Sequence, residues 1–315
     1  MVNDSYFGFP GRPQLEMIIS EVVFFFYTIA LIGNIAIILL PLLDERLQIP
    51  MYFFLRNLAI LDLFYTTNIV PQMLVNVWGK DKKISFSGCA FQLFIDVTLC
   101  TVECMLLAVM SYDRFNAVCK PLHYMTIMNP QLCRGLVTMT WIIGIINCMI
   151  LSTYAMSLPR CENHHLDHYF CEISAMVKIA CVDTTVMEEI LFALCFLIFL
   201  PRLLLILVSY SFIAVAVLKS KSAAGRQKAF GTCSSHLIVV SIFYGTVIYM
   251  YIQPGNSPSQ DEGKLLSIFY SIVTLSLNPL LYQFSSIHTL RNKEFKGVMK
   301  RLIRKEKLSG ETIGH

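Results

Sequence analysis

Seven long apolar runs constrain the fold of this chain more than any other feature. A helix that crosses a bilayer needs about 20 mostly apolar residues, because each residue rises ~1.5 Å through a hydrocarbon core of ~30 Å. The runs are continuous rather than alternating, which favours helices over a transmembrane barrel. Seven spans are expected, at residues 18–43, 57–78, 89–112, 132–158, 190–218, 229–252 and 265–284.

The composition agrees with a membrane protein. Hydrophobic residues make up 56% of the chain and charged residues 15%, which is far more apolar than a soluble domain. The fold class expected is an all-α membrane protein, a seven-transmembrane helix bundle over residues 18–286. It follows an N-terminal tail, 1–17, and precedes a basic tail, 287–315, that is expected to form a short amphipathic helix on the membrane surface.

Basic residues set the orientation of the bundle, because lysine and arginine are retained on the cytoplasmic side. They gather at alternate connections, which places the N-terminus outside the cell. Asn3, in Asn3-Asp4-Ser5, is then a glycosylation acceptor in the right compartment. The inner basic residues are Arg46, Lys120, Arg134, Lys219, Lys221, Arg226, Lys228 and those of the tail, 291–307.

Four cysteines are expected on the outer face, Cys161, Cys171 and Cys181 in the long loop 158–189 and Cys89 at the start of the third span. Oxidising surroundings favour disulfides there, although the sequence alone does not choose among the three pairings. The alternative is a metal site, because cysteines and histidines lie at ligand-like spacing. Its ligands would be Cys161, His164, His165, His168 and Cys171.

An acid and an arginine, Asp113 and Arg114, stand where the third span meets water, within MSYDRFNAVCKPLHY (residues 110–124). Charge at a membrane edge is costly and indicates a function. The other chain-wide motifs are PMYFFL (50–55), Trp141, Ser209-Tyr210, KAFGTCSSHLIVVSIFY (228–244) and NPLLY (278–282). In their order and spacing over residues 33–296, these motifs resemble those of the olfactory receptors, a branch of the rhodopsin-like G-protein-coupled receptors.

The resemblance implies a plasma-membrane receptor, found in olfactory sensory cilia, that binds a small volatile odorant. It would activate the stimulatory olfactory G protein and raise cyclic AMP, with membrane lipids around it, no nucleic-acid partner and no cofactor or metal. The family pairing would join Cys89 to Cys171 and Cys161 to Cys181. The alternatives are a non-olfactory rhodopsin-like receptor for a small amine or acid and, more distantly, a transporter. No catalytic motif indicates an enzyme.

The resemblance also assigns roles to residues. The activation switch and G-protein contacts would be Asp113, Arg114, Tyr210, Lys228, His236, Asn278, Pro279 and Tyr282. A central polar cluster would contain Asn34, Asp62 and Glu103 beside Asn278, either binding sodium or forming a plain hydrogen-bond network. The odorant pocket would be lined by Asp96, Val97, Cys100, Thr101, Leu194, Ile198, Tyr244, Val247, Ile248, Tyr251, Ile268 and Ser271.

Three features of the chain raise separate questions. Asp96 either pairs with an amine ligand or faces water and loop lysines. Arg202, beside Pro201, departs from the family and is hypothesised to pair with Glu103, the alternative being that it snorkels to water or headgroups. Residues 283–288, an insertion relative to the family, either rotate the tail helix or bulge as a loop.

Overall fold

The computed structural model describes residues 13–43, 48–79, 84–159, 170–182, 185–220 and 222–252, together with residues 268, 269, 272 and 278. These parts are helical and contain no strand. The helices are α1 (Pro13–Leu43), α2 (Pro50–Trp78), α3 (Phe86–Cys119), α4 (Tyr124–Ile127), α5 (Pro130–Ser157), α6 (Ile173–Lys178), α7 (Thr185–Lys219) and α8 (Ala223–Ile252). Among the described residues, six helices are long and apolar enough to cross a membrane, namely α1, α2, α3, α5, α7 and α8. The expected all-α membrane bundle is confirmed.

Local signals explain why several helices begin ahead of the apolar runs. Proline takes the first position of α2 (Pro50) and α5 (Pro130), where its missing N–H removes no helical hydrogen bond. Asn129 caps α5 by accepting a hydrogen bond from the N–H of Leu132 at 2.9 Å, and Ser85 caps α3 in the same way. The short helices α4 and α6 lie in connections where the sequence predicted no element.

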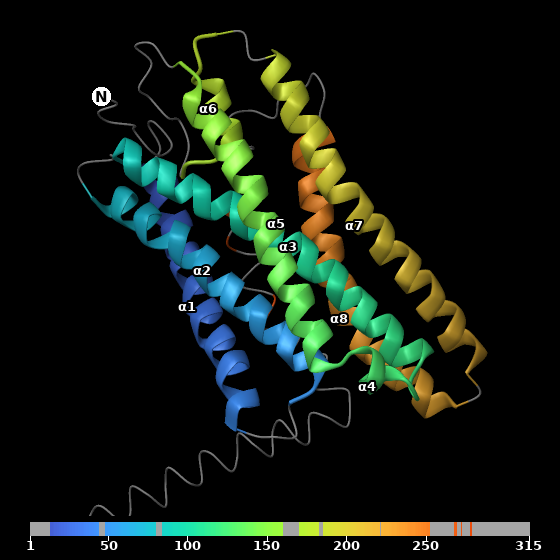
Figure 1. Ribbon diagram of the computed structural model, residues 1–315. Coiled ribbons are helices and arrows are strands. Elements are labelled where there is room, and N and C mark those ends of the chain that lie inside the picture. The colour runs from blue at the N-terminus through green and yellow to red at the C-terminus, as the bar shows by residue number, and fades with distance from the viewer. Residues whose placement is uncertain are drawn as a thin grey trace, which may run out of the picture.

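Helix α3 lies at the centre of the bundle. It contacts α2, α4, α5, α7 and α8, and Figure 1 shows the other long helices arranged around its tilted path. The close approach of α5 depends on Gly144, because a Cβ there would lie 2.5 Å from Cγ2 of Val102 and 3.2 Å from the carbonyl oxygen of Thr98. The central position of α3 brings its polar residues next to those of the other helices.

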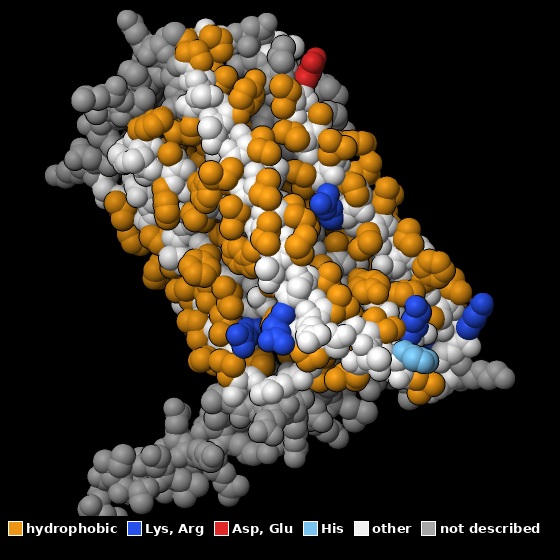
Figure 2. Space-filling view, viewed as in Figure 1, with side chains coloured by type: hydrophobic (Ala, Val, Ile, Leu, Met, Phe, Trp, Pro, Cys, Tyr) orange, Lys and Arg blue, Asp and Glu red, His pale blue; other side chains and the backbone are white. Residues whose placement is uncertain are grey.

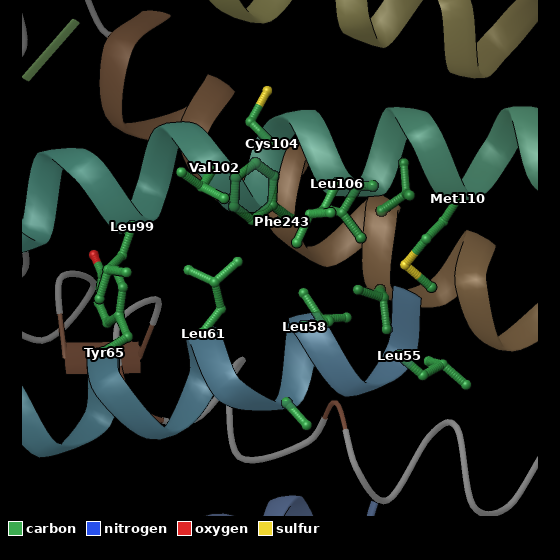
Figure 3. Close-up of a cluster of buried hydrophobic side chains, with 14 of the residues drawn as sticks. Leu55, Leu58, Leu61, Tyr65, Leu99, Val102, Cys104, Leu106, Met110 and Phe243 are labelled. Carbon is green, nitrogen blue, oxygen red and sulfur yellow. The ribbon is translucent and has the colours of Figure 1, made fainter. Parts of the chain in front are cut away.

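Apolar side chains fill the contact between α2 and α3. Figure 3 shows Leu58 and Leu61 of α2 facing Leu99 and Leu106 of α3, with Phe243 of α8 beside them. All five side chains are at most 3% exposed. Because lipid tails are as apolar as leucine, close packing rather than removal from water holds such helices together.

The outward surface is apolar too, as a bilayer requires. Phe25, Leu197 and Phe212 are each more than half exposed. Figure 2 shows apolar side chains over the middle of the visible face, with most of the visible lysines and arginines towards its lower end. A soluble protein rarely exposes so large an apolar area, so lipid must cover it.

Several sequence predictions fall outside the described residues. Of the seventh expected span, the structure describes only Ile268, Phe269, Ile272 and Asn278. Other predictions outside the description concern the glycosylation acceptor Asn3, the loop cysteine Cys161, the candidate metal ligands His164, His165 and His168, the pocket residue Ser271, the switch residues Pro279 and Tyr282, the insertion 283–288 and the tail 287–315. Lys228 and Tyr251 lie in α8, but their side chains are not described.

Candidate functional site

The acid and arginine of the third span lie inside α3, near its inner end. Asp113 is 2% exposed and Arg114 is 6% exposed, so both charges are buried among helices. The hydroxyl of Tyr124, in α4, donates a hydrogen bond of 2.8 Å to Oδ1 of Asp113. This contact ties the inner connection after α3 to the acid next to Arg114.

Arg114 faces a pair of aromatic side chains from two other helices. Tyr210 of α7 and His236 of α8 share a hydrogen bond of 2.8 Å between the tyrosine hydroxyl and Nδ1. Their rings stack with centroids 5.7 Å apart and an interplanar angle of 20°. The guanidinium of Arg114 is close enough to interact electrostatically with both. The inner halves of α3, α7 and α8 therefore meet at three residues that the family resemblance assigned to the switch.

Hydrogen bonds in the central polar cluster join three of the spans. Nδ2 of Asn278 donates to Oδ2 of Asp62 at 3.1 Å, and the same side chain is hydrogen-bonded to Glu103. Asn34 is buried as well, at 1% exposure. Within the described residues, both polar atoms of Asn34 and one oxygen each of Asp62, Glu103 and Asn278 are buried without a hydrogen-bond partner. Two acids with spare buried oxygens form a donor set that fits a small hard cation such as sodium.

Next to this cluster, where Cys104 follows Glu103 in α3, a contact joins α3 to α8. Sγ of Cys104 and the hydroxyl of Tyr244 lie 3.1 Å apart, and both residues are buried. Phe199 of α7 packs edge-on against Tyr244, with ring centroids 6.3 Å apart. Tyr244 therefore touches both α3 and α7 at mid-bundle. Neither of these contacts was predicted from the sequence.

The predicted pocket residues occupy different environments. The buried ones are Val97, Thr101, Tyr244, Val247 and Ile268; the partly buried ones are Asp96, Cys100, Leu194 and Ile198; Ile248 is 41% exposed. Thr101 lies at the contact with α5, where its hydroxyl accepts a hydrogen bond of 3.0 Å from Asn147. Tyr244 and Val247 instead belong to the main apolar core.

Asp96 is the acid among these residues. Its carboxylate accepts a hydrogen bond from the hydroxyl of Tyr65 in α2. The other oxygen, Oδ1, is buried and has no hydrogen-bond partner among the described residues. Glu172, which precedes α6, lies within electrostatic range. A second negative group nearby makes this region favourable for a cation.

A disulfide holds the outer loop against α3. Cys89 and Cys171 are joined, with Cα atoms 5.4 Å apart, which is one of the two pairings that the resemblance implied. Cys181 is also disulfide-bonded. With its sulfur in a disulfide, Cys171 is not a metal ligand, and the described residues contain no group of three metal-ligating side chains.

Gln92 reinforces this attachment one turn after Cys89. Its Oε1 accepts a hydrogen bond of 2.9 Å from the N–H of Cys171, and its Nε2 donates to the carbonyl of Asn68 at 3.1 Å. Asn68 returns a hydrogen bond of 3.2 Å to the carbonyl of Gln92. The side chain thus joins α2, α3 and the outer loop. The available signal was a polar residue inside an apolar span, which calls for a partner.

Replacing Gln92 with leucine is expected to lower the melting temperature of the purified protein. The change leaves the buried N–H of Cys171 without its acceptor, at a cost of about 1–3 kcal/mol. Gln72→Leu is the matched control, because the hydrogen bond that the structure describes for its side chain goes to Asn76 of its own helix and does not involve the outer loop. Equal melting temperatures for the two variants would contradict this role of Gln92 in holding the outer loop.

Comparison with known proteins adds a separate line of evidence. The family model described as 7 transmembrane receptor (rhodopsin family) matches residues 33–282. The chain is 57% identical to olfactory receptor 2W1 of Homo sapiens over 297 residues, which cover 94% of this chain and 91% of that receptor. It is 54% identical to olfactory receptor 2W3 of Homo sapiens over 94% and 92% of the two chains. It is 50% identical to olfactory receptor 2C1 of Mus musculus over 95% and 94%.

Proposed function

Because this chain belongs to the olfactory receptors of the rhodopsin family, we propose that it detects a small volatile odorant and activates the stimulatory olfactory G protein. It is a multi-pass plasma-membrane receptor that binds odorants, and it is not an enzyme. The finer proposal concerns the kind of ligand, the residues that bind it and the G protein that responds. Activation of that G protein raises cyclic AMP.

The observation that carries this proposal is a series of contacts between the outer half and the inner end of the bundle. Tyr244 touches Cys104 at mid-bundle, and, about two turns away on α8, His236 bonds to Tyr210. Both inner residues lie within electrostatic range of Arg114. A rotation or tilt of α8 would change these contacts together, which makes α8 a two-state element that a ligand can bias.

The proposed odorant pocket lies in the outer half between α3, α7, α8 and the seventh span. Most of its residues are apolar, so ligands would bind mainly by dispersion and apolar burial. Tyr244 would form its floor and Asp96 its polar anchor. The pocket residues proposed are Asp96, Val97, Cys100, Thr101, Leu194, Ile198, Tyr244, Val247, Ile248, Tyr251, Ile268 and Ser271.

The test of this function is cyclic AMP in cells that express the full chain with olfactory chaperones and G protein. A chemically diverse odorant panel is applied, and surface staining is recorded in parallel. A dose-dependent response supports the proposal and supplies a ligand class. Surface protein that stays silent to every odorant, and also after deletion of residues 283–288, would contradict it.

Asp96→Asn is expected to lower the potency of amine odorants at least about tenfold, while neutral odorants keep theirs. The physical reason is that the carboxylate has a buried oxygen available to accept from an ammonium group, whereas asparagine carries no charge. Dose–response curves for an amine and for the alcohol of the same carbon skeleton measure the effect. An equal shift for both ligands would show that Asp96 acts on the fold, through Tyr65, rather than on the amine.

A further inference from the structure

Helix α7 contains a break in its backbone hydrogen bonding at Pro201. Proline has no N–H, so the carbonyl oxygen of Leu197, four residues earlier, lacks its usual helical donor. In a bilayer no water is present to replace that donor. A break of this kind normally needs a compensating partner from another helix or a side chain.

The next residue supplies the missing donor. Nη1 of Arg202 lies 3.0 Å from the carbonyl oxygen of Leu197 and 2.8 Å from that of Ile198, and it donates to both. The guanidinium therefore folds back along its own helix, in the direction in which helical side chains point. The hydrogen bonds described for the Arg202 side chain go to these two carbonyls, and the one described for Glu103 goes to Asn278, so the hypothesised pairing of Arg202 with Glu103 is not among them.

The bridged turn is also the turn that touches Tyr244. Phe199 lies in the sequence between Ile198 and Pro201. Its ring packs edge-on against the ring of Tyr244, and its centroid lies 6.3 Å from the ring centroid of Tyr244 and 6.3 Å from that of Phe243. The guanidinium of Arg202 interacts electrostatically with both Cys104 and Tyr244. The geometry of α7 at Pro201 thus determines how Phe199 meets Tyr244 of α8.

We propose that Arg202 is a positioning residue that bridges the Pro201 break, holds Phe199 against Tyr244 and so sets the balance between the two packings of α8. This inference rests on the proposed receptor function. The coupling between residues 201 and 202, on which the inference depends, can be measured without any odorant, whereas the proposed function cannot.

The test is a double-mutant cycle in the full-length receptor. Arg202→Met removes the donor, and Pro201→Ala restores a backbone N–H to the Leu197 carbonyl, which makes the guanidinium dispensable. The melting temperature of the purified receptor and the odorant EC50 at matched surface level are measured for both single variants, the double variant and the unchanged chain.

With proline retained at position 201, Arg202→Met is expected to lower the melting temperature and to shift the EC50 at least about threefold. In the Pro201→Ala background, the change in melting temperature and the change in EC50 caused by Arg202→Met are each expected to be less than about half of their size with proline retained. If Arg202→Met does not reach the surface, rescue by Pro201→Ala supports the proposal and lack of rescue overturns it.

Equal effects of Arg202→Met in both backgrounds would overturn the bridge, because a contact with lipid or with another helix does not depend on residue 201. If the effect of Arg202→Met on the melting temperature depends on residue 201 but the EC50 does not change, the bridge exists and the positioning role is overturned. If no odorant activates the unchanged chain, the proposed function fails, while the melting temperatures still report whether the bridge exists.

Discussion

Replacing Arg114 with alanine is expected to abolish the odorant-dependent rise in cyclic AMP while the receptor still reaches the cell surface. Arg114 is the buried cation at the inner end of α3, close to the hydrogen-bonded Tyr210 and His236. In the proposed active packing, α8 rotates or tilts so that its contacts with Arg114 change, and the guanidinium becomes available to the G protein. Alanine has neither the charge nor the reach to make that contact. The maximal response is expected to fall to less than about a tenth, at matched surface staining.

The control for this prediction is Arg134→Ala. Arg134 is an exposed arginine at the start of α5, and its Nε donates to the carbonyl of Pro130 in its own helix. Its removal lowers the inner positive charge by the same amount without touching α8, so a response close to that of the unchanged receptor is expected. Full signalling by Arg114→Ala would show that coupling depends on other groups and would remove Arg114 from the proposed mechanism.

Replacing Cys89 with serine is expected to remove most of the receptor from the cell surface and to lower the melting temperature of the remainder. The Cys89–Cys171 disulfide closes a loop between residues 82 positions apart. Loss of a native disulfide typically lowers the free energy of unfolding by about 2–5 kcal/mol, because the unfolded chain regains conformational entropy. Among the described contacts, the hydrogen bond to Gln92 and the apolar packing of Met176 and Val177 would remain to hold the outer loop.

Two variants show whether the effect comes from the disulfide. Cys89→Ser/Cys171→Ser is expected to match the single variant, because either change removes the same bond. Cys148→Ser is the control for the loss of a cysteine that is not in a disulfide. Cys148 is a buried free cysteine whose Sγ donates to the carbonyl of Phe94, and a serine hydroxyl can donate to the same carbonyl. A surface level for Cys89→Ser equal to that of Cys148→Ser would contradict the prediction.

The membrane class and the helical spans were predictable from the sequence, because they depend on runs of neighbouring residues. An apolar stretch long enough to cross a bilayer has few alternatives to a helix, since its backbone groups must pair internally. Helix starts were predictable in principle from Pro50 and Pro130, which are local signals as well. The motif around Arg114 likewise marks the inner end of α3 through the local change from apolar to charged residues.

The partners of the polar side chains required the tertiary structure. The charge of Glu103 and Arg202 suggested an ion pair, but Glu103 bonds to Asn278 and Arg202 bonds to the carbonyls beside Pro201. Gln92, a polar residue inside an apolar span, called for a partner, but the sequence did not identify it as Cys171, 79 residues away. Spacing along the chain fixes which face of a helix a residue occupies, whereas the neighbour on that face depends on how distant helices pack. The sequence thus determined the spans, their class and their family, and the packing of α3 against the other helices decided which buried groups meet.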